Sequence, residues 1–175
     1  MFLHSSIHDF DLARWMSGQE VVEVSAEGSG FGPGRPADGR EIMTAVVTLR
    51  LSGGTLAVLE ATWLHPAGYD NRVELVGGSA HLSMGFSPRT PATLLEGVTA
   101  VEVLPWAGYL DRFDDAYRAE LVAFVACCRG QRPPTSTARD GLEALRVAIA
   151  ATRSFGERRA VALDEIAGLS RRADA

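Results

Sequence analysis

Two alternating segments, separated by a pair of glycines, constrain the fold of this chain more than any other feature. Residues 42–51 and 55–63 place apolar and β-branched side chains at alternate positions, which is the period of a β-strand. Gly53 and Gly54 between them tolerate the positive φ angles of a two-residue type I′ or II′ turn. The segment therefore predicts an antiparallel hairpin.

Further short strands are predicted on both sides of this hairpin. They are bounded by glycine and proline, and the first of them runs into a Gly- and Pro-rich loop at residues 28–36. These strands cover residues 21–26, 72–76, 80–84, 92–95 and 99–104, with a last short strand at residues 161–163. We expect the middle of the chain to form one sheet of about six or seven antiparallel strands.

Three segments follow the helical period instead. A short one ends at Ser17-Gly18, and two longer ones cover residues 113–128 and 142–156, the second behind a capping sequence at residues 137–140. Because strands are grouped before the two long helices, the predicted fold is α+β: a large open, mostly antiparallel sheet with helices packed on one face. Neither set of alternating side chains in the hairpin is plainly hydrophilic, so we expect the other face to form a homo-oligomer interface.

Composition bounds the size of the fold and its partners. A chain of 175 residues predicts a single domain, and a formal net charge of −5 argues against nucleic-acid binding. All 17 basic residues are arginine, so any lysine-dependent catalytic step would have to be supplied from elsewhere. Cys127 and Cys128 are adjacent and cannot form an ordinary disulfide, which fits a reducing cytoplasm. With no signal-peptide pattern and no apolar run of ~18 residues, we expect a cytoplasmic protein outside the membrane.

The densest polar cluster lies near the start of the chain. His4 and His8 share one helix face if the helix begins before His4, and they remain neighbours if Ser5 or Ser6 caps it. An imidazole is a natural group to accept a hydroxyl proton while a hydride leaves the same carbon. Spacing alone leaves two alternatives open: histidines that cap or pack beside first-turn acids, and a metal site of both histidines with an aspartate that lacks a clear further ligand set.

A second polar cluster precedes the strand predicted at residues 72–76. Tyr69, Asp70, Asn71 and Arg72 together suit the hydroxyl groups of a polyol or sugar, and loop tips at strand ends often carry ligand contacts. The alternative is a turn in which Asp70 and Asn71 bond their own backbone.

Common signatures of cofactor and metal chemistry are absent from the sequence. No HExxH, Walker A, CxxC or GxSxG motif occurs, and the nearest approach to GxGxxG, at Gly28, has Pro33 at the third glycine position and no helix behind it. We therefore expect no cofactor cradle and no metal site in this chain.

Five segments in the same order resemble the C-terminal domain of the Gfo/Idh/MocA family, the group of glucose–fructose oxidoreductase and myo-inositol dehydrogenase. They are residues 7–15, 53–57, 68–77, 112–120 and 140–146, which together span nearly the whole chain. Members of this family join a Rossmann domain, which binds NAD or NADP and carries a catalytic lysine, to a C-terminal α/β domain with a large open sheet. The resemblance implies that this chain, residues 1–175, is only the second of these domains.

The resemblance also implies roles for individual residues. The catalytic histidine of the family matches His8, and His4 occupies the position of an aspartate that supports this chemistry in inositol dehydrogenases. Tyr69 matches a substrate-contacting tyrosine, and we extend that expectation to Asn71. The implied activity is oxidation of a CH–OH group of a polyol, inositol or sugar, with the nucleotide bound by a Rossmann domain in cis or in trans, so the chain alone is not expected to turn over. The alternative is a non-catalytic oligomerisation or ligand-binding module that retains the fold.

Overall fold

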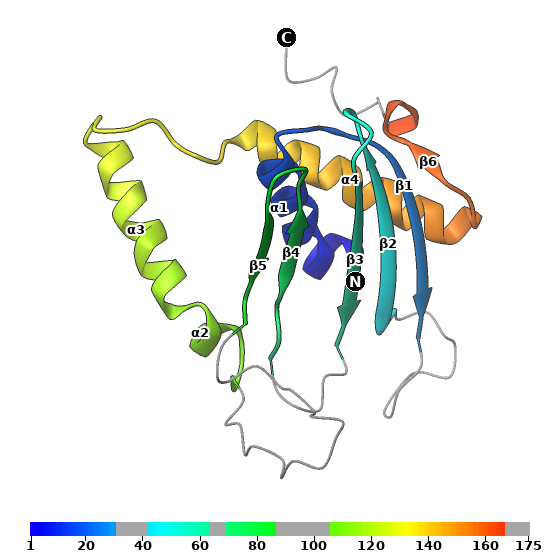
Figure 1. Ribbon diagram of the computed structural model, residues 1–175, viewed down its shortest axis with the longest axis horizontal. Helices are drawn as coiled ribbons and strands as arrows, with labels where there is room; N and C mark the ends of the chain where they lie inside the picture. The colour runs from blue at the N-terminus through cyan, green and yellow to red at the C-terminus, as the bar shows by residue number, and fades with distance from the viewer. Residues whose placement is uncertain (31–41, 64–68, 87–105, 167–175) are drawn as a thin grey trace. The chain divides into compact units, whose positions relative to one another are not determined.

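A computed structural model describes residues 1–30, 42–63, 69–86 and 106–166 (Figure 1). The chain divides into two compact units, one formed by Met1–Leu64 with Thr135–Ala175 and the other by His65–Pro134. The strands predicted at residues 92–95 and 99–104, and most of the predicted Gly- and Pro-rich loop, lie outside the described residues.

The first unit begins with one continuous helical segment. A π-helical turn, η1 (Phe2–Ser6), leads directly into α1 (Ile7–Ser17). The predicted stop is confirmed, because Gly18 adopts the left-handed conformation at φ 63° and its N–H donates to the carbonyl of Arg14 at 2.9 Å. The helix starts earlier than residue 7, which places His4 inside it.

Four strands build the sheet of this unit. The strands β1 (Val21–Ser29), β2 (Thr44–Leu51), β3 (Leu56–Thr62) and β6 (Val161–Ala162) lie in the order β3-β2-β1-β6, and all neighbours are antiparallel. The first strand runs further than predicted, since Gly28 pairs with Ala45. A side chain at residue 28 would meet Ile42 Cγ2 at 2.8 Å, so this glycine allows a close approach within the strand and does not begin the loop.

The hairpin between β2 and β3 is confirmed, but its turn differs from the predicted one. Leu51 pairs with Thr55, so three residues form the loop, and Gly54 closes it at φ 86°. A side chain distant in sequence binds this loop: Gln19 Oε1 accepts from the N–H of Gly53 at 2.8 Å, and Gln19 Nε2 donates to the hydroxyl of Thr55 at 3.0 Å.

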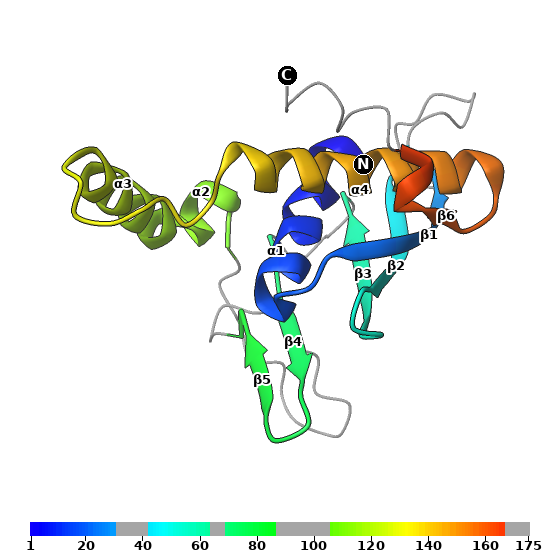
Figure 2. The ribbon, with the colours of Figure 1, turned by 90° about the horizontal axis from the view of Figure 1, so that it is seen from above.

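One long helix covers one face of the four-stranded sheet. The helix α4 (Ala138–Glu157) crosses β1–β3 on that face, and α1 packs beside it (Figures 1 and 2). Its predicted cap is a full capping box between Thr137 and Asp140. Strand β2 alternates strictly between exposed and buried residues, and its buried side chains form the core with those of α4 and the short helix η2 (Leu163–Ile166).

The opposite face of the sheet is mixed in character. Val46, Leu56 and Val58 are 43%, 58% and 66% exposed there, next to threonine, arginine and glutamate side chains. Leu56 and Val58 are two residues apart on β3, and Val46 lies on the neighbouring strand β2, so these exposed apolar side chains are grouped.

The second unit contains a separate hairpin and two helices. Strands β4 (Val73–Val76) and β5 (His81–Met84) pair antiparallel, and α2 (Tyr109–Arg112) precedes α3 (Asp114–Cys128). The predicted helix at residues 113–128 is confirmed. The described residues therefore form an α+β fold with antiparallel strands, but these strands make two sheets and not the single predicted one. Alternation identifies strands and hairpins without specifying which hairpin pairs with which.

Candidate functional site

The helical segment η1–α1 separates a buried stripe from a polar side. Phe2, Ser6, Phe10 and Arg14 recur every fourth residue and are buried, with exposed fractions between 0% and 8%. His4 and His8 lie midway between successive buried positions, and both side chains are exposed. The helix therefore turns its two imidazoles away from the core of the first unit.

The two histidines lie on successive turns of this helix. Because the helix begins at Phe2, His4 does not occupy a preceding turn, and Ser6 makes no side-chain cap. Residues four apart lie on the same side of a helix, so the segment η1–α1 places both imidazoles on one side. Neither ring forms a hydrogen bond within the part of the chain that the structure describes. The Nδ1 and Nε2 atoms of each imidazole can therefore bind a ligand.

A tryptophan that sequence reasoning did not single out lies against His4. The ring centroids of His4 and Trp63 are 5.6 Å apart with an interplanar angle of 49°. Trp63 directly follows β3 and is 50% exposed. The available signal was a large aromatic residue at a strand end, but only the fold shows that this end meets η1.

The carboxylates near the histidines have other environments. Burial raises the pKa of the Asp9 carboxyl, and the charge of the adjacent His8 opposes that shift. Asp11 Oδ1 accepts from Arg14 Nη1 at 3.2 Å. Within the described ranges, no three His, Cys, Asp or Glu side chains are grouped to hold a metal ion. No helix there is long and apolar enough to span a bilayer.

Arg14 fixes the end of α1 that lies opposite the histidines. Its guanidinium donates to both carboxylate oxygens of Glu20, at 2.8 and 3.0 Å, and to the backbone carbonyl of Asp140 at 3.3 Å. This buried cation ties α1 to the start of β1 and to the first turn of α4. Arg14 thus attaches the helix that carries His4 and His8 to both β1 and α4.

The other predicted site residues, Tyr69 and Asn71, belong to the second unit. The N–H of Tyr69 donates to the carbonyl of Trp106 at 2.9 Å, and the Tyr69 ring meets Phe113 edge-on at 5.8 Å. Asn71 is half-buried, and its neighbours Asp70 and Arg72 form an ion pair at 2.7 Å. The segment is therefore anchored to the residues around α2 and not only to its own turn.

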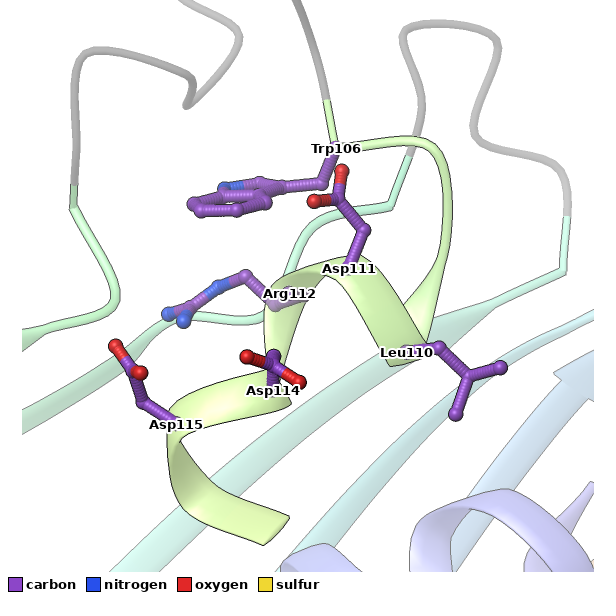
Figure 3. A pocket seen from close by; sticks show the side chains of 6 residues that line it. All are labelled: Trp106, Leu110, Asp111, Arg112, Asp114 and Asp115. Carbon is purple, nitrogen blue, oxygen red and sulfur yellow. The ribbon is translucent and has the colours of Figure 1, made fainter. Parts of the chain in front are cut away.

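A shallow pocket lies beside that anchor (Figure 3). The guanidinium of Arg112 lies over the rings of Trp106 and Phe113, 5.5 and 5.1 Å from their centroids. Carboxylates from the first turns of α2 and α3 surround it; the lining residues are Trp106, Leu110, Asp111, Arg112, Asp114 and Asp115. Acids in first helical turns are expected without a catalytic role, so we assign no chemistry to this pocket.

Comparison with known proteins gives a consistent result. Residues 1–163 match a family model described as the oxidoreductase family, C-terminal alpha/beta domain, of the Gfo/Idh/MocA group. The chain is 34% identical to a myo-inositol 2-dehydrogenase of Thermotoga maritima over 170 residues, which cover 96% of this chain and 50% of that protein. It is 37% identical to the myo-inositol dehydrogenase Hyg17 of Streptomyces leeuwenhoekii, over 88% of this chain and 46% of that protein.

Solved structures show the same partial coverage. A probable dehydrogenase from Thermotoga maritima superposes with a TM-score of 0.82 at 34% identity, over 94% of this chain and 50% of that one. A scyllo-inositol dehydrogenase from Lactobacillus casei, solved with NAD(H) and scyllo-inositol, superposes with a TM-score of 0.80 at 27% identity, over 93% and 48%. The chain spans about half the length of the relatives that it matches.

Proposed function

Because this chain belongs to the Gfo/Idh/MocA oxidoreductase family and corresponds to its C-terminal domain, we propose that it is the substrate-facing half of an NAD(P)-dependent dehydrogenase. Its substrate is an inositol, another polyol or a sugar, of which one CH–OH group is oxidised to a carbonyl. The observation that carries the proposal is the exposed pair His4 and His8, presented by a helix whose other side is buried.

His8 is the proton acceptor in this proposal. In the reaction the substrate carbon loses a hydride and its hydroxyl loses a proton, and a bound nicotinamide supplies the hydride acceptor. The imidazole of His8 takes the hydroxyl proton and later releases it to water, so the charge on the substrate oxygen never has to develop fully. An exposed imidazole with no hydrogen bond to a described residue is free to make this contact.

His4 is the second catalytic residue that we propose. One turn from His8, it can donate or accept a hydrogen bond at the same substrate hydroxyl or relay the proton outward. It differs from the family aspartate, because a neutral imidazole supplies no negative charge to stabilise a protonated His8. This difference also supports the alternative function, a non-catalytic module that retains the fold.

Tyr69 and Asn71 are proposed to bind the remaining hydroxyls of the substrate. A phenol and an amide can each both donate and accept hydrogen bonds, which suits a molecule with a hydroxyl on every carbon. The backbone bond to Trp106 holds the main chain of Tyr69, and the edge contact with Phe113 holds its ring.

We assign the dinucleotide to a Rossmann domain in cis or in trans. The matched relatives are about twice as long as the match. The apolar residues on the outer sheet face, Val46, Leu56 and Val58, support assembly into a homo-oligomer through that face. A cytoplasmic location fits the adjacent thiols of Cys127 and Cys128.

The test is to assay the full-length protein that contains this chain, or this chain combined with the nucleotide-binding half of the Thermotoga relative. Formation of NADH or NADPH is measured with myo-inositol, scyllo-inositol and a panel of polyols and sugars. The dehydrogenase assignment predicts turnover with at least one of them. Inactivity across the panel with either nucleotide, from a folded protein, would favour the non-catalytic module.

A further inference from the structure

Trp63, an exposed aromatic residue directly after β3, is attached to both the sheet and the first helix. Its backbone N–H donates to the carbonyl of Met43 at 2.9 Å, so the antiparallel pairing of β2 and β3 continues through it. Its ring packs against His4, 5.6 Å between centroids. The sheet therefore fixes the main chain of Trp63, and its indole contacts the side chain of His4 on η1.

The rest of the indole is open. Trp63 is 50% exposed and does not belong to the hydrophobic core cluster of the first unit. A buried aromatic side chain typically covers roughly 150–250 Å² of surface. The exposed half of this indole therefore leaves apolar surface available to a ligand. A half-exposed indole against His4, with the exposed His8 one helical turn further along, provides one apolar wall and two hydrogen-bonding groups on the same helical segment.

That combination matches the chemistry of a six-membered polyhydroxylated ring. When the hydroxyls of such a ring are equatorial, its faces carry axial C–H bonds and its rim carries the oxygens. The C–H face packs on an aromatic plane while the rim oxygens meet polar groups. A linear polyol has no rigid C–H face and gains less from a flat wall.

We propose that Trp63 is a substrate-contacting residue, whose indole packs against the C–H face of a cyclitol or pyranose ring while the rim hydroxyls meet His4 and His8. The inference rests on the proposed dehydrogenase function and deepens it by naming the ring form of the substrate. The contact is made equally by bound substrate and transition state, so it contributes to affinity more than to the chemical step.

The kinetic test uses the active full-length or combined enzyme with Trp63→Leu, Trp63→Phe and the matched control Trp15→Leu. Trp15 is a second exposed tryptophan, 71% exposed on α1. Trp63→Leu is expected to raise KM for scyllo-inositol about tenfold with kcat within about twofold, and Trp63→Phe to recover most of the loss. Trp15→Leu is expected to leave both constants unchanged. In Trp63→Leu, the KM for a linear hexitol is expected to rise less than the KM for the inositols.

A binding test does not depend on turnover. When this chain is measured without a nucleotide-binding half, the double variant Trp15→Phe/Trp106→Phe leaves Trp63 as the only one of its three tryptophans, so fluorescence reports on this ring alone. Titration with scyllo-inositol or myo-inositol is expected to shift or quench its emission saturably. Fluorescence that does not respond, or a Trp63→Leu enzyme with the KM of Trp15→Leu, would overturn the inference. An unchanged KM in Trp63→Leu would leave the dehydrogenase assignment intact, because the enzyme still turns over. A wild-type enzyme without turnover would instead contradict the dehydrogenase assignment.

Discussion

Arg14 and Glu20 form a two-point ion pair across the junction of α1 and β1. Nε of Arg14 donates to Oε2 of Glu20 at 2.8 Å and Nη2 donates to Oε1 at 3.0 Å, from an arginine side chain that is only 7% exposed. This pairing and the bond from Arg14 to the carbonyl of Asp140 join three elements at one guanidinium. The helix that carries the histidines is positioned through it.

Replacing Arg14 should therefore destabilise the first unit. Arg14→Leu removes four donor contacts from a buried position and is expected to lower the free energy of unfolding by about 2 kcal/mol. The measurement is chemical denaturation followed by circular dichroism. Arg118→Leu is the control, because Arg118 pairs with Asp114 on the exposed surface of α3 and little change is expected there. An equal change in the free energy of unfolding for the two substitutions would show that the contacts of Arg14 do not stabilise the first unit.

Stability should fall in acid over a defined range. Hydrogen bonds from Arg159 lower the pKa of Glu165 to about 2, from an ordinary value of 4.5. A carboxylate with a depressed pKa in the folded state stabilises the fold above its unfolded pKa, and this contribution is lost as pH falls from about 4.5 to about 2. Thermal unfolding across that range should be less pH-dependent in Glu165→Gln than in wild type. A parallel pH dependence in the two proteins would refute this linkage.

A buried hydroxyl links α4 to β1. Ser154 Oγ accepts from the N–H of Ala26 at 3.0 Å and donates to the carbonyl of Arg159 at 2.6 Å. Ser154→Ala leaves that N–H without its partner and is expected to cost about 1–2 kcal/mol in unfolding free energy. The matched change Thr152→Ala, at an exposed hydroxyl bonded to its own helix, should have a smaller effect. The comparison requires only the thermal midpoints of the two variants.

Gly85 should be essential to the hairpin of the second unit. It has a φ of 89°, and a methyl group there would collide with the backbone carbonyl of Asn71. Gly85→Ala is expected to open β4–β5 and displace Asn71, which faster hydrogen exchange of the strand amides would report. Gly78→Ala is the control, since a methyl group at residue 78 meets nothing within 4 Å. Unchanged exchange in Gly85→Ala would contradict the steric argument.

Local sequence signals predicted much of the fold. The stop at Gly18, the capping box at Thr137 and the hairpin around Gly53 each depend on residues within a few positions of one another, and each is confirmed. Gly28 was misinterpreted because a glycine in a loop and a glycine in a crowded strand look alike until Ile42 is placed beside it.

One part of the candidate site follows from local spacing. A spacing of four residues places His4 and His8 on the same side of a helix. The contact of His4 with Trp63 joins residues 59 positions apart (63 − 4), and no periodicity in either segment encodes it. The anchoring of Tyr69 by Trp106 and Phe113 is likewise a long-range contact.

The role of His8 as proton acceptor is tested most directly by the rate of hydride transfer in the active full-length or combined enzyme with His8→Ala. We expect kcat/KM for the preferred inositol to fall at least about 100-fold, because a general base is lost. His81→Ala, which changes an exposed histidine on β5, should retain the wild-type rate. A His8→Ala enzyme that turns over as fast as His81→Ala would contradict the central claim that this helix presents the proton acceptor.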